Sequence, residues 1–234
     1  MNFLQQFTQQ SVKQVKSILH KARHPLKEQE FASHMVLFDF TNKDTIGKFL
    51  VGCDADTKPD STSVCKLEYK NGCAHFHGDL DENGYAIMRS KLPAASIFGR
   101  LGFDVSKFTM LEIEAKSEDD HQYFLSLRSD LISSDFVHQT KLQLPKNDDF
   151  QTIQIPFADF ILTHKGAIMQ SQSPLNDDNL QTVGLSMIKS TGKFSTYIRK
   201  ISVFNPLAKQ YKDRSNTIGH LVFGMDSKAK NTNK

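Results

Sequence analysis

Residues 75–79 of the chain carry three side chains of the types that bind metal ions. His75, His77 and Asp79 occupy alternate positions, so they share one face if this segment is a β-strand. Two imidazole nitrogens and a carboxylate can hold zinc. The strand pairing predicted below also places Lys66 beside His77, and a cation next to a metal site opposes binding. We therefore interpret the segment as the solvated face of a strand, and we expect neither a metal site nor a cofactor.

A second group of acidic residues, Asp54, Asp56 and Asp60, begins with the spacing of a calcium-binding loop. Pro59 stands where the sharp turn of an EF-hand needs glycine, and Cys65 stands where its bidentate glutamate belongs. The pattern therefore excludes an EF-hand. A calcium loop of another kind, built with backbone carbonyls, stays open.

Signatures of catalysis are missing from the sequence. It contains no GxGxxG, GxxxxGK[ST], HExxH or GxSxG motif. Glu112 and Glu114 are a pair of carboxylates, but acids that alternate along a strand usually form its solvated side. Gly184-Leu185-Ser186 lacks the closing glycine of a nucleophile elbow and is typical of a strand. We expect a protein that acts by binding and is not an enzyme.

The strongest local signal for structure is Asn71-Gly72, which lies between two alternating segments and predicts a β-hairpin. A two-residue turn fixes the register of the two strands. Cys65 and Cys73 then fall on opposite faces, which argues against a disulfide between them. The predicted pairs are Tyr69 with Ala74, Leu67 with Phe76 and Cys65 with Gly78 on one face, and Glu68 with His75 and Lys66 with His77 on the other.

Most of the chain consists of short alternating segments separated by turn residues. Because about ten strands with little helix between them form two-layered or closed sheets, the pattern predicts an antiparallel sandwich or barrel. In the strand at 108–116, Leu111, Ile113 and Ala115 should form the core face. The predicted strands are 35–40, 63–69, 73–78, 85–89, 108–116, 122–128, 136–144, 150–155, 182–188 and 194–204.

Charge is distributed unevenly along the 234 residues. Residues 1–27 carry five basic and no acidic side chains, and residues 207–234 carry six basic and two acidic ones, whereas residues 28–206 have a net charge of −6. An acidic body repels phosphate backbones, so we expect no nucleic-acid binding. We predict a β-sandwich domain at 34–206, between a basic segment at 1–33 and a basic polar tail at 207–234.

The first two dozen residues suit a short amphipathic helix, because Leu4, Phe7, Val15 and Ile18 fall on one face. A basic segment without acids is typical of a mitochondrial presequence, and the alternative is an ordinary surface or docking helix. The sequence contains no apolar run of about 20 residues, so we do not expect it to span a membrane.

From residue 150 onward the sequence resembles a known family. The segments are Phe150-Gln151-Thr152-Ile153-Gln154-Ile155-Pro156-Phe157, Phe160, Thr163-His164-Lys165-Gly166, Gln172-Ser173-Pro174-Leu175 and Val183-Gly184-Leu185. Earlier and later segments also match: Leu37-Phe38-Asp39-Phe40, Gly84-Tyr85-Ala86-Ile87-Met88-Arg89-Ser90 and Ile201-Ser202-Val203-Phe204. Over residues 35–205 the chain is similar to the complex I intermediate-associated protein family. It departs from the family's pattern near residue 54, because it has no tryptophan and reads Asp54-Ala55-Asp56-Thr57.

This resemblance implies a jelly-roll sandwich of the galactose-binding-like type. It implies a non-enzymatic, chaperone-like assembly factor for mitochondrial respiratory complex I, on the matrix side of the inner membrane. The implied partners are membrane-arm assembly intermediates and other assembly factors, including an acyl-CoA dehydrogenase-like protein. A carbohydrate-binding module of the same sandwich class is the alternative, although sugar sites usually stack aromatic rings and the chain has no tryptophan. A glycan-active enzyme would need paired carboxylates in a cleft, and no such pair is evident.

The stretch 163–179 is long and polar for a sandwich connection, and loops of that length are often functional. We predict that it binds a partner. Arg128 and His138, on neighbouring predicted strands, are further candidates for a concave binding face, with exposed strand residues as the simpler interpretation. The candidate residues in the loop are Thr163, His164, Lys165 and Gln172.

Overall fold

The computed structural model describes residues 34–93, 95–96, 99–100, 102–129, 136–144, 146–175 and 177–207. Within them no helix is long and apolar enough to cross a bilayer. The strands are β1 (His34–Asp39), β2 (Phe49–Cys53), β3 (Val64–Lys70), β4 (Cys73–Ser90), β5 (Ala95–Ser96), β6 (Gly99–Arg100), β7 (Met110–Ser117), β8 (Gln122–Ser129), β9 (Phe136–Gln143), β10 (Gln151–Pro156), β11 (Ile161–His164), β12 (Ala167–Ile168) and β13 (Leu180–Phe204). Short 3-10 helices connect some of them: η1 (Lys43–Lys48), η2 (Asp54–Asp56), η3 (Phe157–Asp159) and η4 (Asp177–Asn179).

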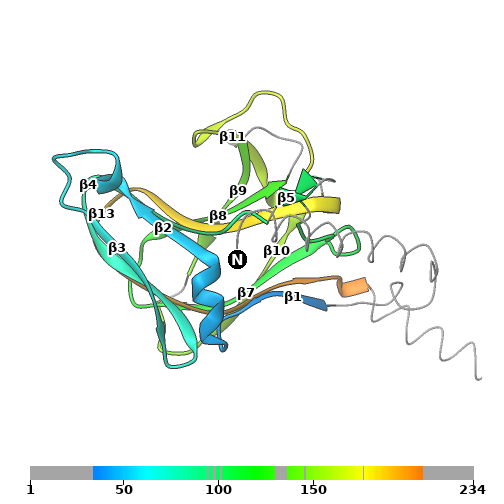
Figure 1. Cartoon of the computed structure of the whole chain (residues 1–234), viewed down its shortest axis with the longest axis horizontal. Coiled ribbons are helices and arrows are strands. Elements are labelled where there is room, and N and C mark those ends of the chain that lie inside the picture. Colours follow the sequence, from blue (N-terminus) through cyan, green and yellow to red (C-terminus); the bar gives the residue numbers. More distant parts are fainter. Residues whose placement is uncertain are drawn as a thin grey trace, which may run out of the picture.

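Two layers of antiparallel sheet make up the body. One layer contains β10, β7, the C-terminal half of β13, the N-terminal half of β4, and β3, with β1 paired to the end of β13. The other contains β2, the rest of β4 and β13, and then β8, β9, β11 and β12. The two layers converge where β3, β4 and β13 lie (Figure 1). The predicted all-β antiparallel sandwich is confirmed. The predicted segment 1–33, and the tail beyond Leu207, lie outside the described residues.

β4 and β13 are long enough to belong to both layers. Their pairing shifts between Ile188 and Ser190 and again between Ser190 and Gly192, and Lys189 and Gly192 have φ values of 53° and 90°. Such irregularities bend a strand and increase its twist without ending it. Turn-type residues at these corners predict breaks between strands. Segments predicted as separate strands are therefore joined: 73–78 with 85–89 in β4, and 182–188 with 194–204 in β13.

Three strands of the second layer were not predicted. β2 is the run Phe-Leu-Val-Gly-Cys, which lacks period-two alternation. β11 and β12 include part of the stretch that was predicted to be a polar loop. Each pairs for only a few residues at an edge of the layer, so the sequence carries little periodicity to reveal them.

The hairpin between β3 and β4 forms as predicted. Asn71 and Gly72 have φ values of 53° and 76°, as a two-residue hairpin turn of this kind requires. All five predicted pairs are confirmed. Cys65 and Cys73 are free thiols, with Cys73 buried and Cys65 half-buried against the core.

Gly78 allows two strands and the core to approach closely at one point. A Cβ atom at this position would lie 1.9 Å from the carbonyl oxygen of Val64 and 2.8 Å from the Phe194 ring. The neighbouring backbone would have to move to accept any side chain. The close pairing of β3 and β4 therefore depends on glycine here.

The core lies between the layers and is built by alternation along the strands. Leu111, Ile113 and Ala115 of β7 are fully buried, which confirms the predicted core face. Removing this apolar surface from water is the main force that holds the layers together. Other large buried side chains include Phe40, Phe76, Met88, Tyr123, Leu125 and Leu127.

Candidate functional site

A pocket of about 450 Å³ lies where β10 leads through η3 into β11. Pro156 ends β10, because proline cannot donate a ladder hydrogen bond, and η3 then turns the chain. The Phe157 N–H donates to the Thr109 carbonyl at 2.9 Å, which anchors the turn to the strand layer. Apolar side chains supply most of the walls. The pocket is lined by Phe157, Ala158, Phe160, Ile161, Gln172, Ser173, Pro174, Leu175 and Asp177.

Gln172 fastens the far wall of this pocket to β11. Its Oε1 accepts from the Leu162 N–H at 2.7 Å, and its Nε2 donates to the carbonyls of Leu162 and Met169 at 3.1 Å and 2.6 Å. The side-chain amide thus pairs with both the N–H and the carbonyl of Leu162, as the backbone of a neighbouring strand would. We conclude that Gln172 positions the loop that carries Ser173 and Pro174.

The β11–β12 hairpin projects beside the pocket. Lys165 and Gly166 form its turn, with φ values of 49° and 82°. The His164 ring packs on the Phe136 ring with centroids 4.6 Å apart. Two isoleucines on this hairpin are exposed, Ile161 by 40% and Ile168 by 69%. Exposed apolar side chains next to an apolar pocket are typical of a protein-binding surface.

His138 of β9 and Thr163 of β11 are both buried. His138 Nε2 lies 2.9 Å from the carbonyl of Ser173, which can only accept, so His138 donates this bond. Thr163 Oγ1 lies 3.0 Å from the Val137 carbonyl and 2.7 Å from Gln139 Oε1. His138 therefore supports the loop from the core side of the layer, whereas Thr163, on the opposite face, joins β11 to β9.

Arg128 does not join this group. His138 is opposite Leu127, so it lies on the core side of the layer, whereas Arg128, one residue further along β8, lies on the other side beside Thr182. The expectation that Arg128 and His138 belong to one concave face is therefore wrong. A register shift of one residue reverses the face of every side chain, and the sequence did not give the register of β8 with β9.

The apolar walls of the pocket were not predicted as a site from the sequence. Phe157, Phe160, Pro174 and Leu175 belong to the very segments that carried the family resemblance. The family resemblance of these segments is therefore the feature of the sequence that could have indicated the pocket. Within the predicted stretch 163–179, the structure places His164 and Lys165 at the hairpin, while Thr163 and Gln172 hold the fold.

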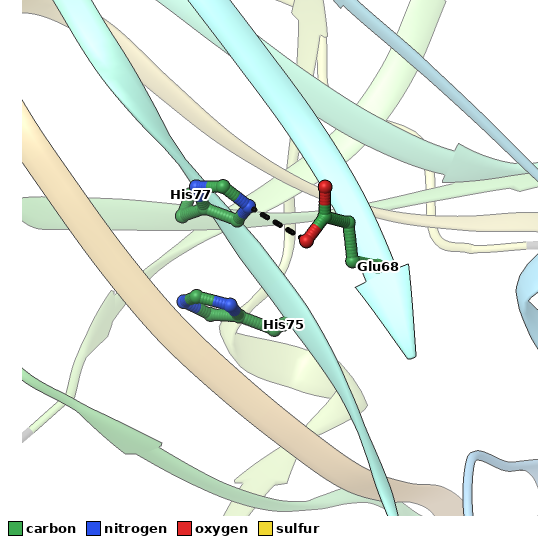
Figure 2. A group of neighbouring side chains, drawn as sticks. All are labelled: Glu68, His75 and His77. Atoms are coloured by element: carbon green, nitrogen blue, oxygen red, sulfur yellow. Dashed lines mark ion pairs between the residues drawn. The ribbon is translucent and has the colours of Figure 1, made fainter. Parts of the chain in front are cut away.

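A second cluster lies on the β3–β4 hairpin, on the face opposite the core (Figure 2). The rings of His75 and His77 stack with centroids 4.2 Å apart, and the Tyr197 ring stacks on His75 at the same distance. Glu68 Oε2 lies 3.6 Å from His77 Nε2. The prediction of a solvated strand face is wrong for His75, which is only 8% exposed because these rings cover it. Asp79 is not part of the cluster; Glu68 takes the third position.

Electrostatics keep His75 uncharged. Burial, followed by the nearby His77 and Lys70, lowers the pKa of His75 to about 4. The Glu118 carboxylate acts in the other direction, because it favours the charged form of His75, but its effect is smaller than that of burial. His75 is therefore neutral at physiological pH.

Two of the three acidic residues that raised the question of calcium, Asp54 and Asp56, have partners inside the protein. The Asp54 carboxylate accepts from the Ser61 hydroxyl at 2.9 Å and from the Tyr85 N–H at 3.4 Å, and Asp56 Oδ2 accepts from the Cys53 N–H at 2.9 Å. Burial raises the pKa of Asp54, but these hydrogen bonds and one with Ser63 hold it below its ordinary value. Asp54 and Asp56 thus build the turn between β2 and β3.

Glu112 and Glu114 are likewise engaged in the sheet. Glu112 accepts from the Gln154 amide at 2.9 Å, and Glu114 forms an ion pair with Arg199. Burial raises the pKa of Glu112, and hydrogen bonds from Gln154, His34 and Ser202 lower it overall. These contacts account for both carboxylates without a catalytic role.

A family model described as complex I intermediate-associated protein 30 matches residues 38–198 of the chain. The match extends from β1 into β13 and includes strands of both layers. It contains the pocket, the β11–β12 hairpin and the cluster at Glu68.

Two curated relatives carry the same description. A mouse protein named complex I intermediate-associated protein 30, mitochondrial, is 26% identical over 198 residues, covering 77% of this chain and 59% of the mouse protein. The Drosophila melanogaster protein of that name is 27% identical over 172 residues, covering 67% of this chain and 57% of its own length. The chain therefore spans less than two thirds of the length of the curated relatives that it matches.

Among solved structures, the family 11 carbohydrate-binding module from Clostridium thermocellum, in complex with a mixed-linked tetrasaccharide, has the same architecture. It superposes with a TM-score of 0.50 at 17% identity, covering 74% of this chain and 95% of that module. At this identity the likeness shows the fold alone. It confirms the jelly-roll type of the sandwich.

Proposed function

The chain belongs to the complex I intermediate-associated protein 30 family, and on that premise we propose that it is a non-enzymatic assembly factor for mitochondrial respiratory complex I. In this role it binds assembly intermediates of the membrane arm, in a chaperone-like manner, together with other assembly factors. An acyl-CoA dehydrogenase-like protein is one such partner. The observation that carries the proposal is the family match over residues 38–198, supported by relatives whose names include both the complex and the mitochondrion.

We place the protein on the matrix side of the inner membrane, attached to it through its partners. The names of the relatives support a mitochondrial location. The basic segment at 1–33 would then serve import, as its composition suggests.

The partner-binding surface in this proposal is the β11–β12 hairpin with the adjacent pocket. It combines exposed Ile161 and Ile168 with the apolar walls at Phe157 and Phe160. Apolar anchors next to a pocket are where binding energy concentrates in protein interfaces. This surface lies in the part of the chain, from residue 150 onward, where the sequence most resembles the family.

A sugar-binding role has weaker support. Sugar sites stack aromatic rings against the ligand, and rings used this way must be accessible. In the part of the chain that the structure describes, Tyr69 is the one aromatic side chain among the exposed large hydrophobic residues. The likeness to a carbohydrate-binding module shows a shared fold and no shared ligand.

Complementation tests the proposal. Cells that lack the protein should contain less assembled complex I, and NADH:ubiquinone oxidoreductase activity of their mitochondria should be restored by the wild-type chain. The double variant Ile161→Ser/Ile168→Ser should restore it poorly. A matched control, Leu50→Ser/Val64→Ser, removes two exposed apolar side chains from β2 and β3, far along the sheet from the hairpin, and should restore it fully.

Normal complex I in cells that lack the protein would contradict the assembly role. Restoration by the hairpin variant as complete as by the control would contradict the proposed surface and leave the role itself intact. Steady-state levels of each variant in the cell separate lost binding from lost protein.

A further inference from the structure

The β3–β4 hairpin brings three metal-ligating side chains to one place (Figure 2). Glu68 of β3 is directly opposite His75 of β4, and His77 follows two residues later on the same face. One ligand atom from each of the three lies within 4.8 Å of the other two. Across the described residues, this is the one group of three or more histidine, cysteine, aspartate or glutamate side chains that meets this criterion.

Hydrogen bonds fix the tautomer of His75. The Ser195 hydroxyl donates its single hydrogen to Glu118 Oε2 at 2.7 Å, so toward His75 Nε2, 3.0 Å away, it acts as the acceptor. His75 therefore donates from Nε2 and carries its lone pair on Nδ1. Metal-binding histidines characteristically donate their second ring N–H to a carboxylate, a backbone carbonyl or a water molecule, and the Ser195 hydroxyl takes that role here.

His77 presents a nitrogen that lacks a partner. Its Nε2 is shielded from solvent, and it neither accepts nor donates a hydrogen bond among the described residues. The nearest carboxylate oxygen, on Glu68, is 3.6 Å away, which is too long for a hydrogen bond. Buried nitrogens without partners are rare and call for an explanation such as an ion. A cation between His77 and Glu68 would be bound by both.

We propose that Glu68, His75 and His77 bind one divalent transition-metal ion of the zinc type. Two imidazole nitrogens and one carboxylate oxygen suit zinc, whereas calcium and magnesium prefer sites made of oxygen alone. Bonds of about 2 Å require the ligand atoms to move closer together than they are without the ion. Glu68 can make that movement, because its side chain is 56% exposed. With three protein ligands, a tetrahedral ion keeps one position for water or a side chain of a partner.

Two lysines on the same hairpin affect this site differently. Lys70 Nζ lies 3.2 Å from the Tyr197 hydroxyl, and Tyr197 stacks on the face of His75 that His77 does not cover. The Lys70 ammonium is therefore held beside Tyr197, and its charge still acts on His75, where it disfavours a further positive charge. Lys66 is exposed and directly opposite His77, so its charge opposes the metal. Removing the charge at Lys66 should strengthen binding.

Calorimetric titration of the chelator-treated full chain with zinc chloride alone tests the proposal, with Co²⁺ absorption spectra reporting nitrogen coordination. We expect one ion per chain. Glu68→Gln and His77→Ala should each weaken binding more than about tenfold, and Ser195→Ala, which removes the positioning partner of His75, by about 10- to 100-fold. Lys66→Gln should tighten it. The control is His34→Ala, which removes a histidine that also pairs with a glutamate, Glu112, but belongs to no group of three ligand side chains among the described residues.

Absence of stoichiometric binding by the wild-type chain would overturn the proposal. So would binding that Glu68→Gln leaves undiminished, because the ion would then be held by other histidines of the chain. Glu68 is exposed and opposite a turn-proximal residue, so this variant should fold normally, and circular dichroism checks that it does. Affinity that rises with protonation below pH 6 would also contradict a site that needs neutral imidazoles.

Discussion

The β3–β4 and β11–β12 hairpins both turn on two residues with positive φ. These are Asn71 and Gly72, at 53° and 76°, in the first hairpin, and Lys165 and Gly166, at 49° and 82°, in the second. The first hairpin pairs seven residues on each strand, whereas the second pairs two. One face of the first packs into the core, while the second leaves Ile168 69% exposed.

The comparison shows that a turn fixes register, whereas packing decides what the hairpin can do. The long hairpin holds polar side chains in fixed relative positions, which suits a metal site. The short hairpin presents apolar side chains at the edge of a layer, which suits a partner. In each case one side chain holds the loop next to the hairpin. The buried Asp54 holds the loop between β2 and β3, and the exposed Gln172 holds the loop that follows β12.

The largest effect should come from Gly78→Ala in the long hairpin. The added Cβ would meet the Val64 carbonyl at 1.9 Å, so the strands must separate, and we expect the free energy of unfolding to fall by about 4 kcal/mol or more. Denaturant unfolding measures this. In the short hairpin, a Cβ atom added by Gly166→Ala would lie in open space. This substitution should lower the free energy of unfolding by only about 1 to 2 kcal/mol, which is the cost of a positive φ at a residue with a side chain. Equal losses at the two positions would contradict the difference in packing.

Removing the two loop-holding side chains should also give unequal losses. Asp54→Ala removes a buried carboxylate and its hydrogen bonds with the Ser61 hydroxyl and the Tyr85 N–H. Ser61 keeps Asp81 as a second acceptor, whereas the Tyr85 N–H loses its side-chain acceptor, and we expect a loss of about 2 to 3 kcal/mol. Gln172→Ala removes hydrogen bonds that water can replace, and should cost about 1 kcal/mol. Thermal and urea unfolding of both variants provide the measurement.

The contribution of Asp54 should also depend on pH. Its folded pKa is below the ordinary 3.8, so the carboxylate stabilises the fold above pH 3.8, and this contribution is lost as the pH falls through the folded pKa. The difference in stability between the wild-type chain and Asp54→Asn should therefore shrink in acid. A difference that grows below pH 3.8 would show that the sign is wrong.

The smallest effect on stability is expected for Ile168→Ser. The side chain is 69% exposed on a two-residue strand, so the free energy of unfolding should change by less than about 0.5 kcal/mol. Partner binding should weaken, because an apolar anchor is lost. A variant that unfolds at markedly lower denaturant would show that the β11–β12 hairpin is a structural element and not a binding surface.

The sequence was most informative where turn chemistry and alternation act together. Asn71-Gly72 gave the register of β3 with β4, including Glu68 opposite His75, and alternation gave the core face of β7. Even there, Asp79 of the same strand was considered as the third potential metal ligand beside His75 and His77. The predicted register already placed Glu68 of the neighbouring strand closer to the two histidines. Cross-strand neighbours are closer than residues four positions apart along one strand, since strands lie about 5 Å apart.

The remaining features depend on contacts that a single sequence does not encode locally. No two-residue turn motif connects β8 to β9, so nothing fixed their register, and Arg128 and His138 were wrongly grouped on one face. The bends in β4 and β13 use residues that elsewhere end strands. The pocket forms because Gln172 reaches back to Leu162, a contact between segments that only the folded chain brings together.

The most direct test of the proposed function is electrophoresis of mitochondria from the source cells on a gel that preserves complexes, probed for this chain. We predict that the chain migrates with a large precursor of complex I, and that the Ile161→Ser/Ile168→Ser variant is found at the size of the unbound protein. A wild-type chain found only in the cytosol, or only unbound within mitochondria, would contradict the assembly role.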